Sequence, residues 1–223
     1  YYLFSEIKNS IDEHERKILE KEIIEKFKET IESFEKKCKN GENDSYICSL
    51  IRQDSIEDFI IYINQTNLSL DNTIEPDYYE SNSFLIDKKP SLIEYASFYG
   101  SIQIVKYLFI NHAKISPKIW PYVIHSNNAE LIYFVQNEMY PNDKNYSKCL
   151  EESIKCFHNE IANYFIVNDN ADVYENSDIL GNLVSKYHNY YFYPDDINSV
   201  IMNPNGLYMY QIMPSFKNIT IPF

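Results

Sequence analysis

The chain has 223 residues, of which 44% are hydrophobic, and a formal net charge of −13. This length allows one large domain or two small ones, and the hydrophobic content is too high for a disordered chain. Four glycines cannot build the glycine-rich loops that hold nucleotide phosphates, and an acidic chain without a basic segment is not expected to bind nucleic acid or an anionic membrane surface.

The cysteine content and the lack of long apolar runs are typical of a cytoplasmic protein. The four cysteines form no C-x-x-C pair and are too few for a disulfide framework, so reduced thiols are expected. No apolar run is long enough for a membrane span, and no signal-peptide pattern is seen. The first residue is Tyr1 rather than Met, which indicates a fragment or a processed chain. Whether the five N-x-S/T sequons are used stays open.

Residues 1–40 are expected to contain one long helix over 11–40. Between Ile24 and Cys38, apolar residues recur at alternating spacings of three and four, and Glu and Lys fill the remaining positions. The stripe could dock on the rest of the chain or form the seam of a coiled-coil dimer. Docking is favoured, because two to three heptads are short for a coiled coil. Asn40 and Gly41 are expected to end the helix.

Residues 41–90 change in character along their length. Two short helices, 45–52 and 55–63, form a degenerate helix pair within 41–63. An acidic connection follows over 64–90, with a short helix expected at Pro76–Glu80. Residues 41–87 contain ten acids and the single base Arg52, a net charge of −9. The charge could form an acidic flank attractive to a basic protein segment, but a solvated loop whose charge only aids solubility is favoured.

From Pro90 onward, short helices recur in pairs separated by polar turns, a pattern that indicates a repeat protein. The expected pairs are 91–99 with 102–110, 119–126 with 129–137, 147–156 with 159–167, and a weaker 180–188 with 194–202. They divide 91–204 into units of about 91–116, 117–145, 146–175 and 178–204, before a tail over 205–223.

The first of these units, over residues 91–113, resembles an ankyrin repeat. Its sequence SLIEYASFYGSIQIVKYLFINHA follows the family pattern T-P-L-H-x-A-A-x-x-G-H-x-x-V-V-x-L-L-L-x-x-G-A, with Ala96 and Ser97 as the small pair and Gly100 as the helix-ending glycine. Weaker copies place Ser55, Asn127 and Phe157 at the glycine position. The stretch of about 40–200 also resembles a degenerate ankyrin-like domain of unknown function, common in ankyrin proteins of protozoan parasites.

The resemblance implies an all-α, ankyrin-type solenoid of three to five helix pairs, with the long N-terminal helix against its first end. It implies a scaffold or adaptor that binds a partner protein, without catalysis or a cofactor, and a monomer is expected. The two residues before each glycine position would face the partner: Gln53, Asp54, Phe98, Tyr99, His125, Ser126, Lys155 and Cys156. For Phe98 and Tyr99, burial of both rings against the 64–90 connection is an open alternative. The partner is unidentified and could be basic. The alternatives are a structural or capping segment of a longer ankyrin protein and, less favoured, an uncharacterised enzyme.

The sequence offers few candidate residues for catalysis or metal binding. His125 and His158 lack the H-E-x-x-H spacing of a zinc site, and His158 matches a turn histidine of the repeat. Cys149 and Cys156 lie seven apart on one helix face, where burial is the favoured interpretation, and no further metal ligands can be placed. An enzyme would need two or more of these four residues in one cleft. Two further features have structural interpretations. Trp120 is expected to pack in the core of its repeat, and Asp195 and Asp196 are expected to be acids in the first turn of a helix.

Overall fold

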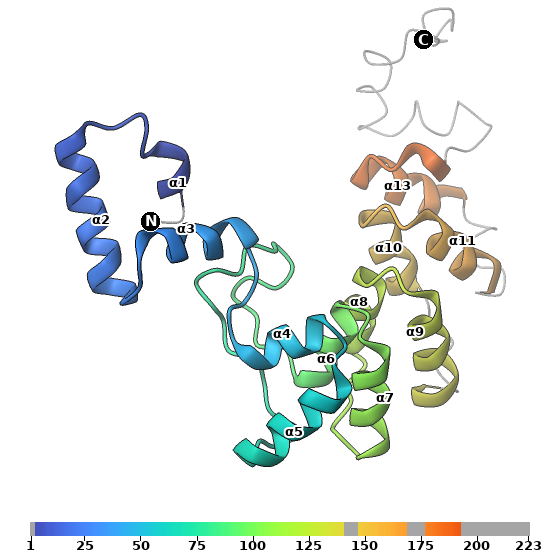
Figure 1. The fold of residues 1–223 in the computed structure, drawn as a ribbon. Helices are drawn as coiled ribbons and strands as arrows, with labels where there is room; N and C mark the ends of the chain where they lie inside the picture. The colour runs from blue at the N-terminus through green and yellow to red at the C-terminus, as the bar shows by residue number, and fades with distance from the viewer. Residues whose placement is uncertain (1–2, 141–146, 169–176, 193–223) are drawn as a thin grey trace, which may run out of the picture. The chain divides into compact units, whose positions relative to one another are not determined.

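The computed structural model describes residues 3–140, 147–168 and 177–192, and within them the chain is all-α, 63% helical and without strands. It divides into two compact units, residues 1–115 and 116–223 (Figure 1). Among the described helices, none combines the length and hydrophobicity needed to cross a bilayer. The predicted helix at 194–202, the acids Asp195 and Asp196, and the tail 205–223 lie outside the described residues.

The prediction of one long helix over 11–40 is wrong. The segment forms two helices, α2 (Glu13–Phe27) and α3 (Ile31–Asn40), after the short α1 (Phe4–Ile7). Lys28 ends α2 in the left-handed conformation, and the Thr30 hydroxyl caps α3 by accepting from the backbone N–H of Ser33 at 3.2 Å. The apolar spacing runs through this break unchanged, so periodicity alone could not reveal it.

The apolar side chains of this segment pack inside unit 1. One cluster combines α1, α2 and α3 with Tyr79 from the following connection; its buried members are Phe4, Ile23, Phe34, Cys38 and Tyr79. Phe27 also contacts Phe34, with ring centroids 4.9 Å apart. Ile24, which the predicted stripe would bury, is 47% exposed, because the break re-orients α2. This packing corresponds to the predicted docking of residues 11–40 on the rest of the chain.

A carboxylate at the α2–α3 break gives unit 1 a pH-dependent contact. Burial opposes ionisation of Glu29, but Lys37 Nζ at 2.8 Å and the hydroxyls of Ser33 and Tyr79 bond the carboxylate, so its pKa lies below the ordinary 4.5. A lowered folded-state pKa adds stability above pH 4.5 that is lost as the pH falls through the folded-state value.

We therefore expect Glu29→Gln to lower the free energy of unfolding by about 1–3 kcal/mol at pH 7. The loss should shrink at a second, acidic pH below the folded-state pKa of Glu29, where the wild-type carboxyl carries its proton. Urea denaturation at both pH values measures the difference, and Glu32→Gln, an exposed acid of α3, is the matched control. An equal loss at both pH values would contradict the assigned role.

The rest of unit 1 holds two helix pairs. Helices α4 (Tyr46–Arg52) and α5 (Ile56–Thr66) form the first pair, and α6 (Leu92–Phe98) and α7 (Ile102–Ile110) form the second. In the two pairs, α4 contacts α6 and α5 contacts α7, so the pairs stack side by side (Figure 1). The Ser101 hydroxyl joins them by donating to the carbonyl of Ile51 at 2.6 Å.

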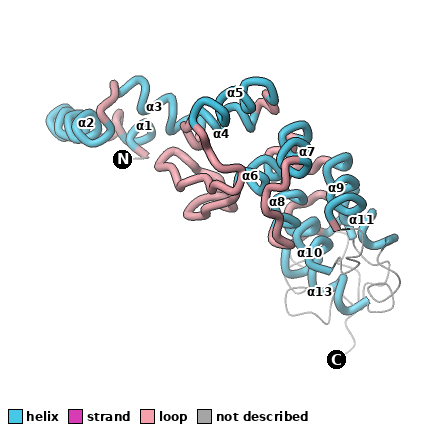
Figure 2. The backbone as a smooth tube through the Cα atoms, turned by 90° about the horizontal axis from the view of Figure 1, so that it is seen from below, coloured by secondary structure: helices cyan, strands magenta, loops and turns pink. Residues whose placement is uncertain are grey.

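The connection between α5 and α6 is a packed loop (Figure 2). The short helix predicted at Pro76–Glu80 is wrong: the segment is a turn, in which Asp77 Oδ1 accepts from the backbone N–H of Tyr79 at 2.7 Å. Ile74, Tyr79 and Leu85 are buried, and they anchor the connection to the unit.

Many acidic residues of 41–87 have partners within unit 1, whereas the sequence predicted an acidic flank or a solvated loop. The ion pairs join Glu42 to Arg52, Asp44 to Lys37, Asp71 to Lys114 and Glu75 to Lys89. Glu80 is only 6% exposed, and burial raises its pKa. Part of the local negative charge is therefore paired with bases within the unit.

Unit 2 continues with short helices. They are α8 (Ile119–His125), α9 (Ala129–Phe134) with the π-helical turn η1 (Val135–Met139), α10 (Ser147–Lys155), α11 (Asn159–Asn168), α13 (Ser177–Tyr187) and the 3₁₀ turn η2 (Tyr190–Phe192). Helix α10 contacts α8, its pair partner α11, and α13. Asn189 Nδ2 donates to the carbonyl of Ile154 at 2.9 Å and so joins the segment after α13 to α10.

The same turn follows α4, α6, α8, α10 and α13. It contains one residue with a positive φ between 49° and 71°, the left-handed region; these residues are Asp54, Gly100, Asn127, Phe157 and His188. In four of the turns, the next residue donates its N–H to the carbonyl five positions back: Ser55 to Leu50, Ser101 to Ala96, His158 to Ser153, and Asn189 to Val184, at 2.9–3.1 Å. This is the Schellman bond that ends a helix with a left-handed residue.

In the turn after α4, the sequence predicted the left-handed position one residue too late. Asp54, not Ser55, takes the left-handed position equivalent to Gly100. Its carboxylate then accepts from the backbone N–H groups of Gln103 and Ile104, both at 3.1 Å, and caps α7. The two residues before this turn are therefore Arg52 and Gln53. Sequence matching missed this because Asp tolerates the left-handed region without a glycine signal.

Phe157 shows where this turn is strained. It holds φ at 60° although it is a bulky residue, and its side chain is 57% exposed, so packing offers little compensation. We expect Phe157→Gly to raise the free energy of unfolding by about 1 kcal/mol, and Gly100→Ala to lower it by about the same amount. Thermal denaturation checks both variants. A loss of stability in Phe157→Gly would show that its ring contributes more than its backbone costs.

Candidate functional site

The eight predicted partner-binding residues fall into two groups, one in each unit. In unit 1, Gln53 is exposed, and Asp54 is engaged as the cap of α7. The Phe98 ring stacks on Phe84 of the α5–α6 connection, with centroids 5.6 Å apart. Tyr99 packs against Tyr95 at 4.9 Å. Both Phe98 and Tyr99 keep part of their surface in solvent.

Arg52 is the polar centre of the unit 1 group. Its guanidinium donates to the carbonyl of Asn43 at 2.9 Å and to the Tyr95 hydroxyl at 3.0 Å. It also pairs with Glu42 at 3.0 Å and lies over the Tyr99 ring, 5.9 Å from its centroid. Sequence reasoning missed Arg52, although it is the only base among residues 41–87 and directly precedes Gln53.

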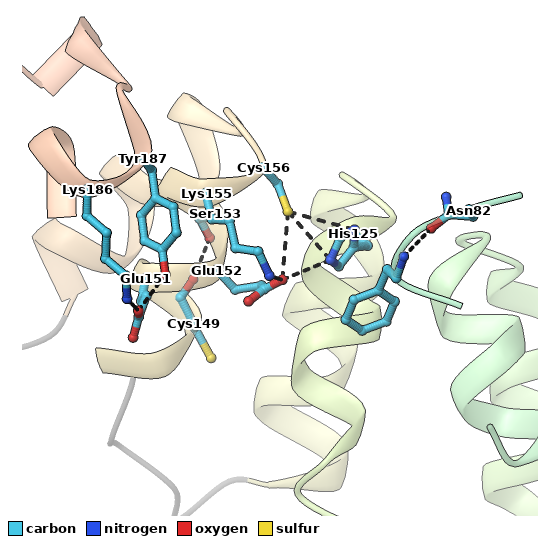
Figure 3. A network of polar contacts seen from close by, with 11 residues as sticks. Asn82, His125, Cys149, Glu151, Glu152, Ser153, Lys155, Cys156, Lys186 and Tyr187 are labelled. Carbon is cyan, nitrogen blue, oxygen red and sulfur yellow. Dashed lines mark hydrogen bonds and ion pairs between the residues drawn. The ribbon is translucent and has the colours of Figure 1, made fainter. Parts of the chain in front are cut away.

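In unit 2, the predicted residues meet a carboxylate that was not predicted (Figure 3). His125 Nε2 lies 2.9 Å from Glu152 Oε1. Cys156 Sγ lies 3.6 Å from His125 Nε2, 3.7 Å from Nδ1, and 4.0 Å from Glu152 Oε1. We call His125, Glu152 and Cys156 the His–Glu–Cys cluster. All three side chains are partly buried.

Local structure explains the convergence. Glu152 and Cys156 lie four residues apart at the end of α10 and share one face of it. His125 is the last residue of α8, which contacts α10. The signal that could have revealed Glu152 is this four-residue spacing from Cys156, whereas the 31-residue separation of His125 from Cys156 becomes informative only once the helix pairs are stacked.

Two neighbours complete the surroundings of the cluster. Lys155 Nζ lies 3.0 Å from Glu152 Oε1, the same oxygen that contacts His125. Ser126, a predicted binding residue, serves the turn: its hydroxyl donates to the carbonyl of Val123 at 2.7 Å and accepts from the N–H of Asn128 at 3.2 Å. Lys155 is thus part of the site, and Ser126 supports the backbone beside it.

The electrostatics of the cluster follow from these contacts. The hydrogen bond from His125, aided by Lys155 and opposed by burial, lowers the pKa of Glu152 to about 2. Burial and the nearby Glu152 carboxylate raise the pKa of the Cys156 thiol to about 11. A protonated thiol beside a carboxylate is the reverse of the electropositive setting that activates a nucleophilic cysteine.

The polar surface continues from α10 to α13 (Figure 3). Glu151 Oε1 accepts from Lys186 Nζ at 2.9 Å and from the Tyr187 hydroxyl at 2.7 Å. Lys186 and Tyr187 are the two residues before the left-handed His188, so they occupy the positions that Lys155 and Cys156 occupy before Phe157. The sequence predicted a weaker helix pair here, but it did not identify Lys186 and Tyr187 as site residues, because His188 replaces the glycine.

The other two chemical candidates, Cys149 and His158, are not members of the His–Glu–Cys cluster. Cys149 is buried in the core of unit 2, so the two cysteines do not share one environment. Burial lowers the pKa of His158, whose ring bonds the backbone of His125. A cavity of about 360 Å³ is lined by residues of α9, α11 and the turns that precede them: Asn127, Ala129, Ile132, Tyr133, Glu160, Ile161 and Tyr164. It includes no member of the His–Glu–Cys cluster.

Comparison with known proteins adds no relative. No family model matches the chain, and no curated protein or solved structure is significantly similar to it.

Proposed function

We propose that this chain is a protein-interaction module, an ankyrin-like solenoid of stacked helix pairs. The observation that carries the proposal is the repeated turn, in which a left-handed residue follows α4, α6, α8, α10 and α13 at Asp54, Gly100, Asn127, Phe157 and His188. Repeats of this kind bury their apolar faces on one another and leave a row of equivalent positions at the surface.

The row of equivalent positions has the chemistry of a binding surface. The two residues before each left-handed position are Arg52 with Gln53, Phe98 with Tyr99, His125 with Ser126, Lys155 with Cys156, and Lys186 with Tyr187. Tyr and Arg are enriched at binding hot spots, and half-buried aromatic rings are rigid anchors. Phe98, Tyr99 and Arg52 are held in place by neighbouring side chains, so little conformational entropy would be lost on binding.

The net charge of −13 favours a partner with a basic segment. Opposite charge accelerates encounter, and salt screens that attraction over about 8–10 Å. The ion pairs of unit 1 reduce the local excess of charge but leave residues 41–87 acidic overall. Association should therefore slow as ionic strength rises.

An enzyme is the weaker alternative. His125 and Cys156 do meet, as a catalytic pair would, but the raised thiol pKa favours a binding role over a nucleophilic one. A capping segment of a longer ankyrin protein, with no partner of its own, is the remaining alternative, and the experiment below separates it from an interaction module.

Photo-crosslinking from single positions in the source cell tests the proposal. A photoreactive residue is placed at Gln53 or Lys155, which lie at or beside the row, and at Ile110 or Tyr133 on α7 and α9 as controls. The controls are 69% and 65% exposed, so their reach into solvent is at least as good. We expect a partner protein to be captured from Gln53, from Lys155 or from both, but not from the controls.

Two results would contradict the proposal. Capture from Ile110 and Tyr133 alone would place the binding surface on the second helices of the pairs. Capture from none of the four positions would favour the capping segment. Thermal denaturation of each labelled chain verifies that the fold is intact.

A further inference from the structure

The His–Glu–Cys cluster brings together three different metal-ligating atoms. An imidazole nitrogen, a carboxylate oxygen and a thiol sulfur all lie within 4.8 Å of one another. One comes from α10, one from Cys156 directly after it and one from the end of α8, and all three side chains are partly sheltered from water. Mixed nitrogen, sulfur and oxygen donors suit zinc, a borderline-soft ion.

The distances between these atoms match the edges of a zinc coordination tetrahedron. Zinc binds nitrogen and oxygen at about 2.0–2.2 Å and sulfur at about 2.3 Å, which places neighbouring ligand atoms about 3.3–3.6 Å apart. The observed separations are 2.9 Å for His125 Nε2 to Glu152 Oε1, 3.6 Å for Nε2 to Cys156 Sγ, and 4.0 Å for Sγ to Oε1. They bracket the required edges, and Sγ lies nearly as close to Nδ1, at 3.7 Å.

We propose that His125 Nε2, Glu152 and the thiolate of Cys156 bind a divalent zinc ion, with water in the fourth position. Binding releases the thiol proton to solvent as the zinc–sulfur bond forms. The ion would cross-link α8 to α10, two helices of successive pairs in unit 2. This inference does not depend on the proposed function, since it uses only the contacts of the cluster.

Lys155 makes a specific prediction about affinity. Its ammonium lies 3.0 Å from Glu152 Oε1 and competes with a metal for that oxygen. Removal of the Lys155 charge should therefore tighten zinc binding. If Glu152 served only its ion pairs, removal of this charge would have no such effect.

The ring of His158 bonds the backbone of His125 and thereby supports the end of α8.

The test is a zinc titration of the full chain, reduced and stripped with a chelator, in competition with a chromophoric chelator. We expect one zinc per chain in the wild type. Cys156→Ser, which keeps the size of the side chain, and His125→Gln should each weaken binding by at least about tenfold. Lys155→Gln should strengthen it several-fold. Cobalt provides a second readout, because its thiolate charge-transfer band should appear in the wild type and be lost in Cys156→Ser.

Two matched variants control for other thiols and histidines. Cys149→Ala removes the buried thiol of the same helix, and His14→Gln removes an exposed imidazole of α2. Both should bind zinc as the wild type does, and far-UV circular dichroism verifies the fold of every variant. Unchanged zinc affinity in Cys156→Ser, or no thiolate band with cobalt in the wild type, would overturn the proposal.

Discussion

Replacing Tyr95 with alanine is expected to lower the free energy of unfolding by about 3–5 kcal/mol, the usual cost of removing a fully buried aromatic ring. Tyr95 is 1% exposed and is among the largest fully buried side chains of the described chain. Its hydroxyl accepts from Arg52 Nη1 at 3.0 Å, and its ring packs on Tyr99. The substitution would leave both a cavity and a poorly paired guanidinium, so both effects act in one direction.

Tyr95→Phe separates the two contributions. It keeps the ring and removes the hydroxyl, which accepts from Arg52 and also bonds Tyr99 and Cys48, so we expect a loss of about 1–3 kcal/mol. Urea denaturation followed by circular dichroism measures both variants. A loss in Tyr95→Ala no larger than that in Tyr95→Phe would contradict the assignment of this ring to the core of unit 1.

Trp120→Ala is expected to cost about 3–5 kcal/mol in unit 2. Trp120 is 6% exposed in the first turn of α8, and its ring lies 6.4 Å from that of Phe165 of α11, which is fully buried. Pro121 follows it without harm, because a proline in the first helical turn removes no helical hydrogen bond. The expected result supports the interpretation of Trp120 as packing.

Matched variants sharpen this second prediction. Trp120→Phe should cost less than Trp120→Ala because it fills part of the cavity, and the exposed Tyr133→Ala should change stability by less than about 0.5 kcal/mol. Thermal denaturation followed by circular dichroism suits all of them, since the chain has a single tryptophan and its fluorescence is lost in the variants. A stability of Trp120→Ala close to that of the wild type would instead point to a binding role for the ring.

The sequence predicts the helix pairs well where local signals agree. Polar turn residues and apolar spacing predicted α6 with α7, α8 with α9, and α10 with α11 to within a few residues, and the prediction of an all-α chain is confirmed for the described residues. Gly100 and Asn127 were informative because few residue types adopt the left-handed conformation easily.

Tertiary contacts decided what the sequence could not show. The α2–α3 break depends on Thr30 as a cap and on Glu29 meeting Tyr79, which is 50 residues away. Asp54 takes a turn position because its carboxylate reaches α7, a contact that no local pattern encodes. The His–Glu–Cys cluster likewise needs α8 and α10 side by side before its ligands become neighbours.

The proposed function rests on the repeated turn, and amide hydrogen exchange tests that turn most directly. The N–H groups of Ser55, Ser101, His158 and Asn189 donate to helix carbonyls, whereas the N–H of Asn128 donates to the side chain of Ser126. We expect slow exchange at the first four amides and faster exchange at Asn128, as NMR would resolve them. Exchange of those four amides at the rates of an unfolded peptide would contradict a stack of helix pairs joined by one recurring turn.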